Sequence, residues 1–93
     1  MTSINPDTVF ALNELASLQS MGDGAVILLA DTGQLYTCNE TTEAFLKHVD
    51  GRRSFAEIVR LFIEEFEVNE AAARDELAEL SRNLVAERIL DRR

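Results

Sequence analysis

Three side chains in this sequence could take part in chemistry: the Cys38 thiol, the His48 imidazole and the Ser54 hydroxyl. A nucleophile of this kind needs an adjacent base, or a positive charge that lowers its pKa. His48 is the only histidine, no partner stands at a recognisable spacing from it, and Cys38 has no basic residue close by in the sequence. We therefore expect an inert, partly buried thiol and a helix-end histidine. We predict no catalytic residues and no enzymatic activity.

Ser54 could also be the attachment serine of an acyl carrier protein, since the chain is acidic and its second half has a helical pattern. That role usually requires Asp-Ser-Leu at a helix start, whereas this chain has Arg53-Ser54-Phe55. Glu57 lies three residues after Ser54, the spacing at which each side chain accepts a hydrogen bond from the backbone N–H of the other residue. The pattern favours a structural Ser54 that begins a helix.

The composition of the chain argues against several classes of ligand. Cys38 is the only cysteine, so no intramolecular disulfide can form and no cysteine and histidine cluster completes a zinc site. We expect neither a metal nor a cofactor. The 17 acidic and 9 basic residues give a net charge of -8, which would repel the phosphate backbone of nucleic acid. Nucleic acid is therefore not an expected partner.

Length and hydrophobic pattern predict one small domain. The 93 residues, 46% of them hydrophobic, leave room for one core, and we place a single domain over residues 1–93 with an ordered part at about 9–90. No apolar run approaches the roughly 20 residues of a membrane-spanning helix. Met1 to Phe10 has neither a basic region nor a long apolar segment. We expect no secretion signal, no membrane association and a cytoplasmic location.

The first part of the chain has the pattern of strands separated by turns. Residues 15–19 could form a strand, and the two glycines of residues 21–24 are free to adopt positive φ where the chain reverses. Residues 25–30 read as a buried strand. After a second reversal at residues 31–33, residues 34–38 alternate polar with apolar side chains, as a half-buried strand does. The last two strands most simply form an antiparallel hairpin.

The rest of the chain predicts three helices. Asn39 can cap a helix that starts near Glu40 and stops at Asp50-Gly51. The second helix follows Ser54 and has an apolar face made of Phe55, Ile58, Val59, Phe62, Ile63 and Phe66. Asn69 caps the third helix, from Glu70 to about Arg88, whose core stripe would be Ala73, Leu77, Leu80 and Leu84. Ile89 and Leu90 would end the fold by packing back against it, and residues 91–93 would form a solvated tail.

A small hairpin followed by helices is also typical of winged-helix DNA-binding domains, in which the third helix would be the recognition helix. It carries more acidic than basic residues: Glu70, Asp75, Glu76, Glu79 and Glu87 against Arg74, Arg82 and Arg88. A recognition helix is ordinarily basic or neutral toward the groove. The charge argues against DNA binding, but it leaves open a winged-helix regulatory or dimerisation module that lacks DNA contacts.

The order of these pieces resembles the PqqD family, small domains that recognise the leader segments of ribosomally made, later modified peptides. The likeness covers about Leu15 to Leu90. It rests on an apolar strand at Val26–Leu29, a strand closing on Asn39, a helix, Asp50-Gly51 with Arg52-Arg53, and then Phe55-Ala56-Glu57-Ile58-Val59. Cys38 stands where members of the coenzyme PQQ pathway usually have leucine. This departure, together with Gly33, Tyr36 and Asn39 in a Gly-x-x-Tyr-x-x-Asn arrangement, makes the chain more similar to the stand-alone recognition proteins of lasso-peptide and other modified-peptide pathways.

The resemblance implies an α+β, winged-helix-like fold of three antiparallel strands followed by three helices. It also implies that a leader peptide adds as a strand between the third strand and the third helix. A second row on that helix, Arg74, Ala78, Ser81 and Val85, is expected to line the groove, with Arg74, Arg82 or Arg88 pairing with leader carboxylates. The expected peptide-binding residues are Gln34, Leu35, Tyr36, Thr37, Cys38, Arg74, Ala78, Ser81, Arg82 and Val85.

The same resemblance implies partners for the domain. It would hold a precursor peptide by its leader and present it to a modifying enzyme such as a radical-SAM protein, or to a leader peptidase. The alternative within the family is a peptide chaperone of PQQ biosynthesis that acts with a radical-SAM enzyme. Because the edge of the third strand would be exposed, a homodimer is possible when no leader is present.

Overall fold

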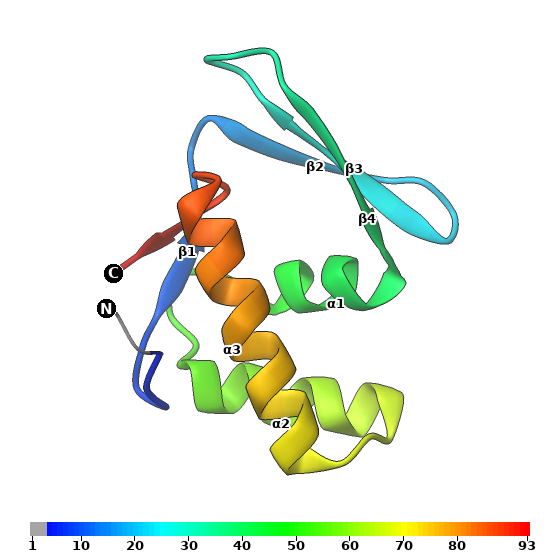
Figure 1. The fold of residues 1–93 in the computed structure, drawn as a ribbon, viewed down its shortest axis with the longest axis vertical. Helices are drawn as coiled ribbons and strands as arrows, with labels where there is room; N and C mark the ends of the chain where they lie inside the picture. The colour runs from blue at the N-terminus through cyan, green and yellow to red at the C-terminus, as the bar shows by residue number, and fades with distance from the viewer. Residues whose placement is uncertain (1–3) are drawn as a thin grey trace.

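The computed structural model describes residues 4–93, so the first three residues of the N-terminal segment considered above lie outside it. The chain is an α+β fold with a three-stranded antiparallel sheet followed by three helices (Figure 1). Its elements are β1 (Phe10–Leu12), β2 (Ala16–Ser20), β3 (Gly24–Leu29), β4 (Leu35–Asn39), α1 (Glu40–His48), α2 (Phe55–Phe66), α3 (Glu70–Ala86) and β5 (Leu90–Arg92). The predicted order of three strands followed by three helices is confirmed for β2 to α3.

The sheet has the order β2-β3-β4, with the central strand buried and β4 at an edge. Ile27 of β3 lies opposite Leu18 of β2 and Tyr36 of β4. Of the two glycines expected to turn the chain before β3, only Gly22 has a positive φ. Gly24 already belongs to β3, and a Cβ at that position would overlap the carbonyl oxygen of Cys38. It is required for the close approach of two strands rather than for the turn.

The helices begin where the polar side chains predict. Asn39 and Asn69 each accept a 3.0 Å hydrogen bond from a backbone N–H in the first turn of α1 and α3. At α2, the Glu57 N–H donates to Ser54 and the Ser54 N–H donates to Glu57, so both halves of the capping box form. Ser54 therefore has the structural role that its neighbours indicate.

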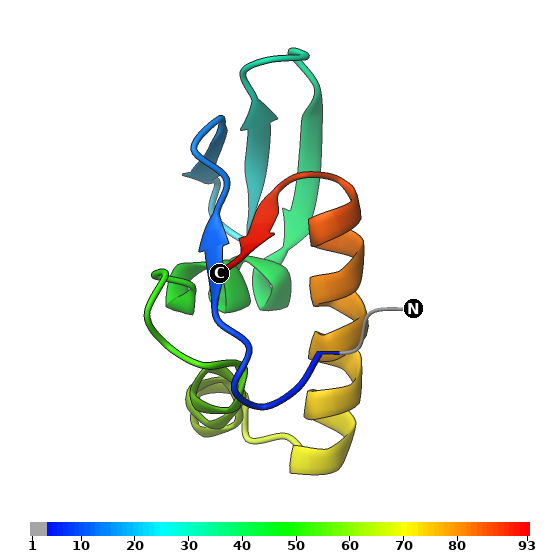
Figure 2. The same cartoon turned by 90° about the vertical axis from the view of Figure 1, so that its left-hand side faces the viewer.

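A second, two-stranded sheet joins the ends of the described chain, and the sequence pattern does not predict it. β1 pairs antiparallel with β5, with Ala11 opposite Asp91, and the two strands lie side by side in Figure 2. The Arg93 N–H also donates to the carbonyl of Val9 at 2.8 Å. The expectation that residues 91–93 form a free solvated tail is wrong, because their backbone completes this sheet while their side chains remain exposed.

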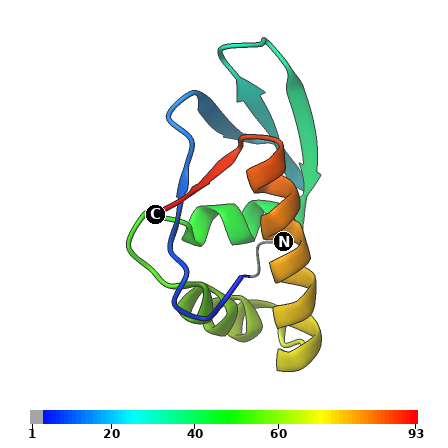
Figure 3. The ribbon, with the colours of Figure 1, turned by 60° about the vertical axis from the view of Figure 1, so that its left-hand side comes forward.

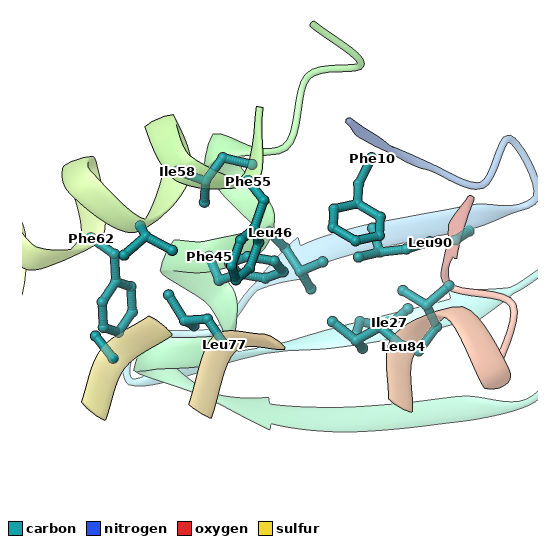
Figure 4. Packing of buried hydrophobic residues seen from close by; sticks show 14 of the residues in the cluster. Phe10, Ile27, Phe45, Leu46, Phe55, Ile58, Phe62, Leu77, Leu84 and Leu90 are labelled. Atoms are coloured by element: carbon teal, nitrogen blue, oxygen red, sulfur yellow. The ribbon is translucent and has the colours of Figure 1, made fainter. Parts of the chain in front are cut away.

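The hydrophobic core lies between the inner face of the three-stranded sheet and the helices (Figure 4). Phe10, Phe45 and Ile58 are completely buried there, and Phe10 meets Phe55 edge to face with ring centroids 6.5 Å apart. Ile27 and Leu90 reach the same core from β3 and β5. All three helices lie on one side of the sheet (Figure 1), and no helix among residues 4–93 is both long and apolar enough to cross a membrane.

Candidate functional site

β4 is one of the two edge strands of the sheet, and β2 is the other. β4 pairs with β3 on one side, and within residues 4–93 no strand pairs with its other side. The Leu29 N–H donates to the Gln34 carbonyl at 2.9 Å, which makes these two residues a hydrogen-bonded pair. Such pairs alternate along an antiparallel ladder, so Tyr36 and Cys38 bond to β3. The N–H and C=O groups of Leu35 and Thr37 therefore point toward the free edge.

The side chains of β4 divide between the two faces of the sheet. Leu35 and Thr37 are exposed on the outer face, whereas Tyr36 and Cys38 are half-buried on the face toward the helices. The Tyr36 hydroxyl donates a 2.6 Å hydrogen bond to Glu87 at the end of α3. Burial, together with the nearby Glu43 carboxylate, raises the pKa of the Cys38 thiol, although a backbone hydrogen bond with Ala25 opposes the shift. A raised pKa favours the neutral thiol over the reactive thiolate.

One flank of α3 faces the side on which β4 lies. Glu87 is on this flank, and so is Leu80, about two helical turns earlier. Leu80 helps to line a cavity of about 450 Å³. Thr41, in the first turn of α1 and two residues after β4, lines the same cavity. The rest of its lining is largely apolar: Phe62, Phe66, Val68, Ala72, Ala73, Glu76 and Leu77. We name this hollow the Leu80 cavity.

The arginine row of α3 lies on the opposite flank of the helix. Arg74, Ala78 and Arg82 line a separate cavity of about 610 Å³, together with Ile4, Pro6, Phe55, Ala56, Val59, Glu70, Asp75 and Glu79. Residues 78 and 80 of a helix point about 160° apart, since each residue turns the helix by about 100°. Figures 1 and 3 show the N-terminal segment on this side of α3 and β4 on the other.

The predicted groove residues therefore do not come together in one groove. Gln34 to Cys38 lie at the β4 edge, whereas Arg74, Ala78 and Arg82 lie across α3 from it. Ser81 is completely buried and its hydroxyl donates to the Leu77 carbonyl at 2.7 Å, so the expectation that it belongs to an outward row is wrong. Val85 is half-buried against the core. The buried row of α3 is Ala73, Leu77, Ser81 and Leu84, with Leu80 turned partly outward.

The other polar side chains singled out in the sequence have structural contacts. His48 lies at the end of α1, as expected, and its Nε2 is 3.1 Å from Glu65 of α2. Glu43 is buried at the start of α1, where it accepts a hydrogen bond from Ser20 of β2 and lies 3.4 Å from Lys47. The Ser20 hydroxyl, followed by the charge of Lys47, lowers the pKa of Glu43 although burial opposes this. These contacts hold α1 against β2 and α2.

Comparison with known proteins identifies related families and folds. The model of the family described as "Coenzyme PQQ synthesis protein D (PqqD)" matches residues 24–90. The solved structure "TbiB1 in Complex with the TbiA(beta) Leader Peptide" is similar with a TM-score of 0.79 at 17% identity, covering 87% of this chain and 94% of that one. "Lasso peptide synthetase B1 complexed with the leader peptide" has a TM-score of 0.77 at 22% identity, covering 88% and 96%. No curated protein matches the sequence significantly.

Proposed function

This chain belongs to the PqqD family, and from that premise we propose that it binds the leader segment of a ribosomally synthesised precursor peptide. The leader would lie as an added strand along the free edge of β4, beside the flank of α3 that carries Leu80. The observation that carries this proposal is the unpaired edge at Leu35 and Thr37, together with a largely apolar cavity that is lined by Thr41, two residues beyond β4, and by the Leu80 flank of α3. Both structural relatives are complexes with leader peptides, which supports the same assignment.

Strand addition fits the chemistry of this edge. Backbone groups of the leader would pair with those of Leu35 and Thr37, and this pairing gives affinity that depends little on sequence. Alternate leader side chains would point to the helix side, where Tyr36, Cys38 and the Leu80 cavity supply apolar surface. Selectivity would then come from the apolar leader residues that fill this cavity.

The charges beside β4 favour a basic leader. Glu76 lines the Leu80 cavity and Glu87 lies at the other end of the same flank of α3. Two of the three arginines expected to pair with leader carboxylates, Arg74 and Arg82, line the cavity on the opposite flank, whereas Arg88 follows the end of α3. We therefore propose that the bound segment of the leader carries lysine or arginine, rather than acidic residues, near its apolar anchors.

In this role the protein performs no chemistry of its own. It would hold the leader in the cytoplasm and present the core of the precursor to a modifying enzyme, such as a radical-SAM protein, or to a leader peptidase. Binding the precursor and the enzyme to the same domain raises the effective concentration of one for the other, to about millimolar for short flexible linkages. When no leader is present, the free edge of β4 offers a pairing site to a second copy of the chain.

Calorimetric titration with a synthetic leader peptide tests the binding and its place. Thr37→Pro removes one outward N–H at the edge, where proline is tolerated, and should weaken binding about tenfold or more while circular dichroism stays unchanged. Ala78→Trp fills the cavity on the opposite flank of α3 and should leave the affinity unchanged. Loss of binding in Ala78→Trp but not in Thr37→Pro would move the leader to that cavity. No binding by the folded wild-type domain would overturn the proposal.

A further inference from the structure

Most of the exposed large apolar side chains among residues 4–93 belong to the three-stranded sheet and its surroundings. Five large hydrophobic residues among residues 4–93 are exposed: Leu15 (43%), Met21 (59%), Leu28 (40%), Leu35 (65%) and Val68 (42%). Val68 lies in the Leu80 cavity. The other four belong to the three-stranded sheet or to the residues that immediately flank its strands. Their concentration on so small a sheet differs from the scattered exposure of single apolar residues that is normal on a soluble surface.

The alternation of the strands places three of these four side chains, those of Leu15, Leu28 and Leu35, on the same face, whereas Met21 lies in the turn between β2 and β3. Ala16, Ile27, Leu29 and Tyr36 point to the core side, so their neighbours in sequence point outward. Leu28 lies directly opposite Leu35 on β4 and Ser17 on β2. The Leu15 carbonyl accepts a 2.8 Å bond from the Ala30 N–H, which puts Leu15 diagonally next to Leu28. We name Leu15, Leu28 and Leu35 the leucine face, and no helix of the described chain covers it (Figure 1).

The charged residues within the sheet and immediately beside its strands in the sequence are acidic. The first lysine or arginine of the sequence is Lys47, so the entire sheet and both of its turns lack basic side chains. The residues that flank its strands include Glu14, Asp23, Asp31 and Glu40. A second copy of this chain, docked face to face, would bring two such acidic rims together, which is unfavourable. A complementary partner would present apolar residues surrounded by lysine and arginine.

We propose that the leucine face is the docking surface for the enzyme that acts on the bound precursor, and that this enzyme offers an apolar patch with a basic rim. The inference rests on the proposed leader binding, because a leader strand on β4 would extend the same sheet and lie beside the docked enzyme. Leu35, which belongs both to the leucine face and to the edge strand, makes the two surfaces continuous. Docking here would place the enzyme next to the peptide it processes.

The test measures enzyme docking and leader binding separately in each variant. Leu15→Thr/Leu28→Thr removes apolar area from the leucine face, keeps residues that suit strands, and changes no residue of β4. At saturating leader, its affinity for the purified leader peptidase or radical-SAM enzyme of the same pathway should fall at least tenfold, while leader affinity changes less than twofold. Met21→Ser is the matched control, since Met21 is also an exposed apolar residue but lies in the turn between β2 and β3, outside both the leucine face and the Leu80 cavity. It should leave enzyme docking unchanged.

Other results would overturn the inference. Wild-type docking by the folded double variant, or absence of docking by a wild-type domain that binds leader, would overturn the inference and leave the proposed function standing. A domain that self-associates through this face, and becomes monomeric in the double variant, would identify a second copy as the occupant and also overturn it. If the double variant fails to fold, the salt dependence of wild-type docking tests whether the partner has a basic rim. Association should slow at least tenfold between low and high salt, and salt-independent association would contradict a basic-rimmed partner.

Discussion

The Tyr36 hydroxyl donates a 2.6 Å hydrogen bond to the Glu87 carboxylate, and this bond joins the edge strand β4 to the end of α3. It spans the space on the Leu80 flank of α3, where we propose that the leader lies. The bond, and with it burial and the negative charge of Glu87, raises the pKa of Tyr36 above its ordinary value of 10.0. The contact therefore fixes the separation of strand and helix at one end of the proposed site.

The raised pKa of Tyr36 can be measured directly, because the chain has one tyrosine and no tryptophan. Absorbance at the tyrosinate band should give a titration midpoint above 10.0 in the wild-type protein. Glu87→Gln removes the negative charge that opposes ionisation, so the midpoint should fall toward the ordinary value. Glu64→Gln, on the outer side of α2, is the control and should leave it unchanged. Equal midpoints in all three proteins would show that the bond is absent in solution.

Electrostatic attraction should contribute to leader binding through the Leu80 flank. Glu76 is exposed at the rim of the Leu80 cavity, so Glu76→Gln should weaken the binding of a lysine- or arginine-containing leader by about two- to fivefold, as expected for an exposed charge pair. The effect should shrink at high salt. Arg74→Gln, on the opposite flank, should not weaken binding. A leader that binds more tightly to Glu76→Gln than to wild type would contradict the basic leader proposed here.

Local signals in the sequence account for most of the fold. Asn39, Ser54 with Glu57, and Asn69 begin the helices because each satisfies backbone N–H groups within its own first turn. Gly33 adopts a φ of +75° at the predicted reversal, and Gly51 adopts a φ of +78° where the first helix is predicted to stop. The pairing of β1 with β5 depends on residues at opposite ends of the chain, and each strand has only three residues. Neither strand is long enough for an alternation of polar and apolar side chains to be recognised in the sequence.

The site was less predictable than the fold, because it depends on how α3 is rotated. Leu80 and Ser81 both stand three or four residues from Leu77 and from Leu84, so helical spacing alone allows either to face the core. Hydrophobicity favours burying Leu80, whereas the structure buries Ser81, whose hydroxyl bonds to the carbonyl one turn earlier. This rotation turns Leu80 toward the Leu80 cavity and Ala78 away from it. The free edge of β4 follows from the strand order alone and does not depend on the rotation of α3.

Acid should destabilise the domain partly through Glu43. Its pKa is held below the ordinary 4.5 by the Ser20 hydroxyl and Lys47, so the carboxylate stabilises the folded state above about pH 4.5, and this contribution is lost as the pH falls through the lowered value. The urea midpoint should therefore fall on acidification below pH 4.5, and less steeply in Glu43→Gln. Part of the slope should remain, because backbone N–H groups of Arg53 and Arg52 lower the pKa of Asp50 in the same direction. An unchanged slope in Glu43→Gln would contradict the contact with Ser20.

The rotation of α3 can be tested by the stability of two variants at Ser81. Because this residue is completely buried in a packed row, Ser81→Leu should lower the free energy of unfolding by about 1–3 kcal/mol through overpacking. Ser81→Ala removes only a hydroxyl bonded to its own helix and should change it by less than about 0.5 kcal/mol. Urea unfolding, with the slope compared between proteins, measures both. If Ser81 instead faced solvent, leucine would fit without strain and both variants would match wild type, and the two flanks of α3 would have to be exchanged.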